Sequence, residues 1–450
     1  MNKKTSNHPF KRIGIILLGI MGAYGIATIP IGIPFSAQTM LAITFVSMLF
    51  WITEVFPLHA TALLVGVLLI LFGGFNIDQV FASYFDRVVV LVLGGFVLAS
   101  ALSKHKLDDY LSQKLLGKFG SSPRMVLLGV LLVTAGISLW ISNSAAAALS
   151  LPIVLVILKS HKLVPGKSNF SKSMVIAVAY GATIGGIGTL IGSTPNVITQ
   201  KFLTNAGISF GFMDWTIRGL PFAGILLILT WIILQFLYPS ELKKVKTTPH
   251  PHPFTNEQKM VGIIFLSTVL LWVTESIHGI PNSVVAIFPI ILLSLFRLVT
   301  PEDFNKIGWD SLILIGGGIA LGLGIENSGL SAWLANQLGT ILSNQSIPII
   351  LLLLGIIGVG LTSFLSNTAA SAIFIPIITS LAATIGIDPT NLVVAAGVGV
   401  SLDFLFPMGT PPTAIAYSTG YIHTTDLLKS GILVSLAGTI LLSIMGYLVW

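Results

Sequence analysis

ISNSAAAALSLPI, residues 141–153, and LSNTAASAIFIPI, residues 365–377, share one pattern: a polar tripeptide, then small residues, then a proline. Each tripeptide joins two apolar arms that we expect to be shorter than the roughly 20 residues a helix needs to cross a bilayer. Irregular backbone at membrane depth is tolerated only where protein or water satisfies its N–H and C=O groups. The pattern therefore predicts two re-entrant hairpins, over residues 125–158 and 347–381, with the tripeptides at their tips.

The composition places the whole chain in a membrane. Of its 450 residues, 54% are hydrophobic and 9% are charged, and the mean hydropathy is +0.95. The apolar runs are continuous rather than alternating, which favours helices and excludes a β-barrel. The net charge of +7 is typical of cytoplasmic loops and does not call for a nucleic-acid partner. The absence of cysteine excludes disulfides and thiolate chemistry. We predict an all-α polytopic protein of the cell membrane.

Basic residues predict the orientation of the chain. They gather in the N-terminal tail and in the segments 104–124 and 159–172, on either side of the first hairpin. Both ends of that hairpin, like the N-terminus, are therefore expected in the cytoplasm. The segments around the second hairpin, 326–346 and 383–391, contain no lysine or arginine. Both of its ends are expected outside, and so is the C-terminus.

An internal repeat accounts for this alternation. TFVSMLFWITE (44–54) matches FLSTVLLWVTE (265–275), and GSTPNVI (192–198) matches GTPPTAI (409–415). Units of roughly five spans and a hairpin would place the second copy upside down, which is the inverted-topology repeat of secondary transporters. The predicted boundaries are 1–36 for the tail and an extra first helix, 37–238 for the first repeat, 239–259 for a cytoplasmic linker and 260–450 for the inverted second repeat, with about 11 spans in all.

The hairpin tips carry groups that suit both cations and anions. Each tip ends one half-helix, whose carbonyls suit a cation, and begins another, whose N–H groups and positive dipole end suit an anion. Asn143 and Asn367 can serve both, because an amide offers an oxygen and an NH₂ group. Ser144 and Thr368 add hydroxyls.

Two further interruptions supply the opposite wall of the expected site. GSTPN (192–196) and GTPPT (409–413) break otherwise apolar segments. Proline removes a backbone donor and frees nearby carbonyls, while Gly192 and Gly409 allow backbone geometries closed to other residues. Together with the tips, these breaks predict two cation sites around one central anion site.

Asp403, in VSLDFLFPMGTPP, breaks the symmetry of the repeat because its counterpart is Gly186. An acid at membrane depth is a functional hypothesis by default. Asp403 could tune coupling to a cation or a proton, or it could pair with a polar group in the broken helix. The sequence does not separate these two hypotheses.

The twin tips, the twin breaks and WITEVFPLHATALL (51–64) resemble the divalent anion/sodium symporters, also called the DASS or INDY-type family. The resemblance implies a homodimer that transports small divalent anions with Na⁺ by an elevator motion. It implies one Na⁺ site at Ser138, Ser142, Asn143 and Gly192, and another at Thr362, Leu365 (by its carbonyl), Asn367 and Gly409. It also implies that substrate carboxylates meet Asn143, Ser144, Ser193, Asn367, Thr368, Thr410 and Pro411.

The favoured function is Na⁺-coupled symport of a C4-dicarboxylate such as succinate or malate, with no cofactor and with membrane lipid around the protein. A dicarboxylate exchanger or an H⁺-coupled anion carrier on the same fold is the alternative. A sulfate carrier or a channel fits less well, since a channel has no evident use for two half-sites from inverted repeats. An enzyme is not expected, because no nucleophile–base or metal constellation is visible in the sequence.

Overall fold

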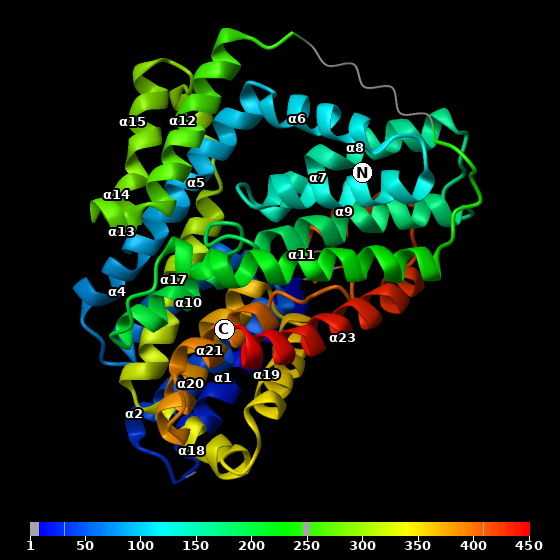
Figure 1. Cartoon of the computed structure of the whole chain (residues 1–450). Helices are drawn as coiled ribbons and strands as arrows, with labels where there is room; N and C mark the ends of the chain where they lie inside the picture. Colours follow the sequence, from blue (N-terminus) through cyan, green and yellow to red (C-terminus); the bar gives the residue numbers. More distant parts are fainter. Residues whose placement is uncertain (1–8, 31, 246–252, 408) are drawn as a thin grey trace.

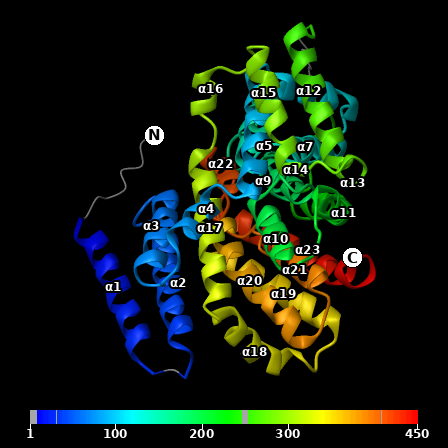
Figure 2. The same cartoon turned by 90° about the vertical axis from the view of Figure 1, so that its left-hand side faces the viewer.

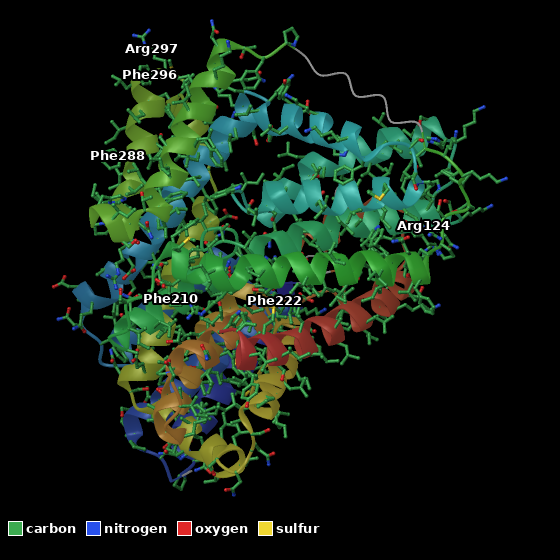
Figure 3. All side chains as sticks on the ribbon, in the orientation of Figure 1. Arg124, Phe210, Phe222, Phe288, Phe296 and Arg297 are labelled. Atoms are coloured by element: carbon green, nitrogen blue, oxygen red, sulfur yellow. The ribbon has the colours of Figure 1, made fainter. Side chains whose placement is uncertain are left out.

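The computed structural model describes residues 9–30, 32–245, 253–407 and 409–450, which form only helices, turns and loops (Figure 1). This confirms the predicted all-α class. The predicted N-terminal tail up to residue 8 and residues 246–252 of the predicted linker lie outside the described ranges. Exposed apolar side chains cover the outer faces, among them Phe288 and Phe296 on the outer edge of the molecule (Figure 3). Such a surface suits a multi-pass protein surrounded by lipid.

The helices of the first half follow an extra N-terminal helix. They are α1 (Pro9–Thr28), α2 (Phe35–Thr53), α3 (Leu58–Leu71), α4 (Ile77–Tyr84), α5 (Arg87–Lys104), α6 (Leu107–Leu116), the 3₁₀ turn η1 (Gly117–Phe119), α7 (Pro123–Ser138), α8 (Asn143–Ser160), α9 (Asn169–Ile187), α10 (Thr194–Asn205) and α11 (Phe212–Leu237).

The second half presents its helices in a matching order. They are α12 (Asn256–Val273), α13 (Glu275–His278), α14 (Asn282–Val285), α15 (Ile287–Leu295), α16 (Pro301–Asn305), α17 (Trp309–Asn327), α18 (Leu330–Leu342), α19 (Ile347–Thr362), α20 (Asn367–Ile385), α21 (Pro389–Gly399), α22 (Pro411–Ser418) and α23 (Thr424–Leu448). The inverted relation between the halves stays a prediction.

The number and length of the spans differ from the sequence prediction. Within the described ranges, nine helices are long and apolar enough to cross a membrane, against about 11 expected. Two of the nine are α8, with 18 residues, and α20, with 19 residues. The first arms, α7 and α19, have 16 residues each, so the second arms, α8 and α20, are the ones that approach the length of a span. The reason is that both helices continue through an internal proline, Pro152 or Pro376.

The polar tripeptides interrupt the chain because their first residue caps the following helix. The Ser142 hydroxyl accepts a hydrogen bond from the Ala145 N–H at 3.4 Å, and the Ser366 hydroxyl accepts one from the Ala369 N–H at 3.3 Å. A serine in this position satisfies a backbone donor that the helix itself leaves without a partner. Each cap thus fixes where the second arm begins, and places the asparagine of the tripeptide in its first turn.

The two halves interlock through α9. This helix is buried along almost its whole length, and the Tyr180 hydroxyl lies 3.0 Å from the Phe404 carbonyl and 2.9 Å from the Ser430 hydroxyl. At one end of α9, the Lys172 ammonium lies 3.0 Å from the Asp426 carboxylate. On the other side of the molecule α3 packs along α17, again across the halves (Figure 2). Neither half therefore has a complete core of its own.

The packing of α7 on α9 leads to a stability prediction. A Cβ atom added at Gly185 would overlap the backbone of Ala135, whereas one added at Gly136 would have no neighbour within 4 Å. Forcing a methyl group into such a contact typically costs about 1–3 kcal/mol. We expect Gly185→Ala to lower the melting temperature of the purified protein, measured in detergent, and Gly136→Ala, the control, to leave it unchanged or raise it. Equal melting temperatures would contradict the close approach of the two helices.

Candidate functional site

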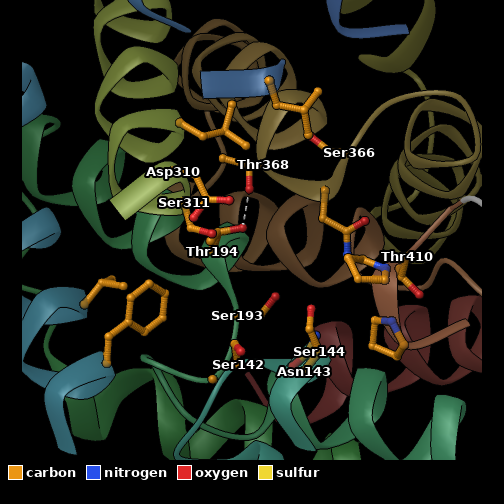
Figure 4. A pocket seen from close by; sticks show the side chains of 18 of the residues that line it. Ser142, Asn143, Ser144, Ser193, Thr194, Asp310, Ser311, Ser366, Thr368 and Thr410 are labelled. Carbon is orange, nitrogen blue, oxygen red and sulfur yellow. Dashed lines mark hydrogen bonds between the residues drawn. The ribbon is translucent and has the colours of Figure 1, made fainter. Parts of the chain in front are cut away.

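A cavity of about 530 Å³ lies where the tripeptides and the helix breaks meet (Figure 4). Its walls come from the start of α8 and α20, the chain just before α10 and α22, and the start of α3 and α17. Segments from both halves of the sequence therefore enclose one space. The two halves are also linked directly by a hydrogen bond of 2.6 Å between the hydroxyls of Thr194 and Thr368.

The structure brings the predicted substrate residues together. The cavity lining includes all of them, namely Asn143, Ser144, Ser193, Asn367, Thr368, Thr410 and Pro411. Of the predicted Na⁺ ligands, the lining also includes Ser142, Gly192 and Gly409. The others, Ser138, Thr362 and Leu365, are buried and do not line it. The predicted cation ligands thus extend from the cavity wall into the protein behind it.

Several oxygen atoms of the first half converge behind the Asn143 tip. The Ser138 hydroxyl donates to the Ala182 carbonyl at 2.6 Å and lies 2.8 Å from Asn143 Oδ1. That amide oxygen faces only acceptors; with the amide turned over, its nitrogen would donate to the Gly192 carbonyl at 3.1 Å. Hydroxyl, carbonyl and amide oxygens are the ligands that hard cations prefer. The donor set therefore fits the predicted cation site.

The second half repeats the arrangement. The Thr362 hydroxyl donates to Asn367 Oδ1 at 2.6 Å, just as Ser138 pairs with Asn143. Leu365, whose carbonyl is the predicted ligand, is 4% exposed. The Asp403 carboxylate lies against Gly409: a Cβ atom added at Gly409 would overlap both of its oxygens. Asp403, a candidate coupling residue in the sequence analysis, therefore adjoins the predicted cation ligand Gly409.

Four helix N-termini border the cavity. Residues that begin α8, α10, α20 and α22, or immediately precede them, belong to its lining. The Ser193 and Thr410 side chains do not cap the helices they precede, so no hydroxyl of these two residues occupies the N–H groups of the first turn. A helix N-terminus carries partial positive charge, and four of them favour an anion in the space between.

Several polar lining residues were not assigned to the site by the sequence analysis, among them His59, Thr194, Asp310 and Ser311. His59 lies within the quoted motif 51–64, but nothing in the motif indicates which of its side chains faces a cavity. Asp310 and Ser311 lie in the first turn of α17, and the repeat partner of Asp310 is the apolar Val89, so the repeat offers no signal. None of the described lining residues is lysine or arginine.

An all-helical membrane protein with a polar central cavity between interrupted helices belongs to the class of membrane transporters. More particularly, the chain belongs to the sodium:sulfate symporter family, whose transmembrane-region model matches residues 11–450. This confirms the resemblance to the divalent anion/sodium symporters, and with it the prediction that the protein is a transporter rather than an enzyme.

Individual relatives agree with this assignment. The chain is 33% identical over 454 residues to the sodium-dependent dicarboxylate transporter SdcS of Staphylococcus aureus strain USA300, covering 93% of this chain and 87% of the relative. It is 32% identical over 452 residues to SdcS of strain MRSA252, with the same coverage. Among solved structures, the YdaH transporter of Alcanivorax borkumensis matches with a TM-score of 0.58 and 14% identity, over 98% of this chain and 99% of that one. This last likeness concerns the fold alone.

Proposed function

We propose that the protein is a Na⁺-coupled symporter of small divalent anions, with C4-dicarboxylates such as succinate or malate as substrates. The observation that carries the proposal is the single cavity in which both tripeptides and both helix breaks meet. The sodium-dependent dicarboxylate transporter SdcS, a relative over most of this chain, supports the choice of ion and substrate.

In the proposed binding mode the substrate anion and the Na⁺ ions occupy two adjacent layers of the site. In the cavity, the N-termini of α8, α10, α20 and α22 and the hydroxyls of Ser144, Ser193, Thr368 and Thr410 receive the two carboxylates. Behind the cavity wall, the oxygen clusters around Asn143 and Asn367 each hold one Na⁺. The two ions supply the positive charge that the lining lacks, because helix dipoles contribute only partial charges.

We further propose how the protein moves and how it is oriented in the membrane. The repeats are inverted, α7–α8 and α19–α20 are re-entrant hairpins that enter from opposite faces, and the N-terminus is cytoplasmic. The protein is a homodimer in which a transport part carries the site across the membrane by an elevator motion. The helices of the second half follow one another in an order that matches the first half, which supports the repeat and its predicted boundaries.

Site-directed labelling tests the orientation. The chain has no cysteine, and Ser121 and Ser343 are exposed next to α7 and α19. In intact cells, a membrane-impermeant thiol reagent is expected to label Ser343→Cys, and to label Ser121→Cys only after permeabilisation, with the cysteine-free chain as the control. Labelling of both variants from the same side would rule out the inverted arrangement.

Removal of the tip hydroxyls tests the anion site. Ser144→Ala and Thr368→Ala each delete one hydrogen bond to a charged group, worth roughly 1.5–3 kcal/mol, or about 10- to 150-fold in affinity. We expect substrate affinity to fall by that factor in equilibrium binding to the purified protein. Ser363→Ala is the matched control, since among the described residues its hydroxyl bonds only to the Val359 carbonyl, one turn back, at 2.7 Å. Unchanged affinity in both tip variants would remove the hydroxyls from the substrate site.

The family description names sulfate, and sulfate is also a small dianion. Uptake of labelled succinate into proteoliposomes, with sulfate as competitor, separates the two substrates. We expect unlabelled succinate to compete strongly and sulfate weakly. The two carboxylates of succinate are separated by its carbon chain and can engage helix N-termini on opposite walls of the cavity, whereas sulfate has a single charged centre. Equal competition would assign a general dianion site.

A further inference from the structure

Asp403 carries a carboxylate that is buried without a partner. The residue is 1% exposed, and among the described residues neither carboxylate oxygen has a hydrogen-bond partner of acceptable geometry. The nearby Leu405 backbone N–H falls short of that geometry. Within the described ranges no lysine, arginine or histidine forms an ion pair with it. A buried charge is costly unless a counter-charge accompanies it, so this site calls for a cation.

The chain on both sides of Asp403 is held in place. The Leu402 carbonyl accepts a hydrogen bond from the Ser435 hydroxyl at 3.0 Å, and the Phe404 carbonyl accepts one from the Tyr180 hydroxyl at 3.0 Å. These donors come from α23 and α9, one helix in each half of the chain. The carboxylate is therefore positioned by its neighbours on both sides, although it has no partner of its own.

The carboxylate is directed at Gly409. A Cβ atom added at Gly409 would overlap both of its oxygens, which places them in contact with the glycine backbone. In the first half the equivalent glycine, Gly192, faces the backbone of Gly186 instead. An added Cβ at Gly186 would in turn overlap the Asn143 amide. The glycine of the helix break therefore faces the backbone of Gly186 in the first half and the carboxylate of Asp403 in the second half.

We propose that the Asp403 carboxylate is a direct ligand of the cation bound in the second half. The inference rests on the proposed Na⁺ coupling and deepens it. The first site then consists of neutral oxygens, and the second combines neutral oxygens from Thr362, Leu365, Asn367 and Gly409 with one anionic oxygen. Carboxylates raise the affinity of oxygen sites for hard cations, so the second site fills at a lower Na⁺ concentration than the first.

The asymmetry also changes the charge that the substrate meets. A Na⁺ ion paired with Asp403 is neutralised by the protein, whereas the ion in the first site keeps its full charge. The dianion is then held chiefly by the ion at the Asn143 side and by the helix N-termini. Removal of the Asp403 charge has two opposite effects: it weakens Na⁺ binding and strengthens dianion binding once both sites are filled.

The test titrates the purified protein with NaCl in the absence of any dianion. Choline chloride keeps the ionic strength constant, and the melting temperature reports binding. For Asp403→Asn we expect the NaCl concentration of half-maximal stabilisation to rise about 10- to 150-fold, if the lost carboxylate contributes as much as a hydrogen bond to a charged group. Asp388→Asn is the matched control, since Asp388 is an exposed helix cap whose role asparagine retains; its titration is expected to equal that of the wild type.

Two further measurements show whether Asp403 is a cation ligand or a residue with a purely structural role. In choline chloride, Asp403→Asn is expected to melt no lower than the wild type, because an unpaired buried charge is gone. At saturating NaCl it is expected to bind succinate a few-fold more tightly. Asp403→Gly, which gives the second half the residue type of Gly186, is expected to reproduce the weakened Na⁺ binding and to bring the two Na⁺ affinities closer together.

The outcomes distinguish this inference from the proposed function. If the wild type responds to NaCl and Asp403→Asn responds with the same midpoint, the carboxylate is not a ligand and Na⁺ coupling stands. The same result is expected if Asp403 is protonated in the folded protein, because asparagine imitates the neutral acid. If the wild type itself does not respond to NaCl, Na⁺ coupling fails and this inference fails with it.

Discussion

The variants Asn143→Asp and Asn367→Asp are expected to lose dianion transport while they keep Na⁺ binding. Each retains a side-chain oxygen next to the hydroxyl of Ser138 or Thr362, so the cation keeps its ligand. Each loses the NH₂ donor and gains a negative charge at the cavity wall. At about 4 Å and an effective dielectric constant of about 20, one such repulsion amounts to about 4 kcal/mol, which corresponds to a loss of roughly three orders of magnitude in affinity.

Uptake of labelled succinate into proteoliposomes measures the loss, and NaCl-dependent melting measures the retained Na⁺ binding. The control is Asn344→Asp, the same change at an exposed position between α18 and α19. Both variants are expected to lose transport, because each places the added negative charge at one of the two tips that line the cavity. A variant that transports succinate with wild-type affinity would show that its amide does not face the anion.

Substrate affinity is expected to depend on Na⁺ and not on salt in general. The described cavity lining has no lysine or arginine, so the dianion obtains its full counter-charge only when Na⁺ is bound. Typical coupling free energies of 1–3 kcal/mol correspond to about 5- to 150-fold for each coupled ion. Equilibrium binding of succinate to purified protein in NaCl, compared with choline chloride at the same ionic strength, measures this factor.

Linkage adds an independent check to that experiment. Succinate must raise the affinity for Na⁺ by the same factor by which Na⁺ raises the affinity for succinate. Equal succinate affinity in the two salts would reject Na⁺ coupling. The exchanger or the H⁺-coupled carrier would then be the better assignment, and the two are separated by whether uptake requires a dicarboxylate on the other side of the membrane.

Those parts of the fold that rest on long apolar runs and on capping serines could be predicted from the sequence. The breaks before α8 and α20 fall at the predicted tripeptides because Ser142 and Ser366 are N-caps, and capping is a local property. The helices α6 and α18 were not predicted, since their polar residues lower the hydropathy of segments that were assigned as flanks of the hairpins. Tertiary packing, which the local pattern does not contain, makes these segments helical.

The sequence allowed those site residues to be predicted that have a counterpart in the other half of the chain. Asn143 and Asn367, or Gly192 and Gly409, could be recognised as pairs, and the structure places all four in the cavity lining. Asp310 and His59 have no such partner, and they reach the cavity only because α17 and α3 pack side by side. The place of Asp403 against Gly409 depends on how the chain between α21 and α22 turns, and no periodicity specifies a turn of that kind.

The interlocking of the halves through α9 bears on how the protein is made. Tyr180 finds its acceptor at Phe404, 224 residues further along the chain, and at about 5–20 residues per second a ribosome needs about 10 to 45 seconds to reach it. During that interval α9 carries a hydroxyl, and at Lys172 an ammonium group, whose native partners have not yet been synthesised. The first half therefore enters the membrane as an incomplete intermediate, and its final packing waits for the last helix to leave the ribosome.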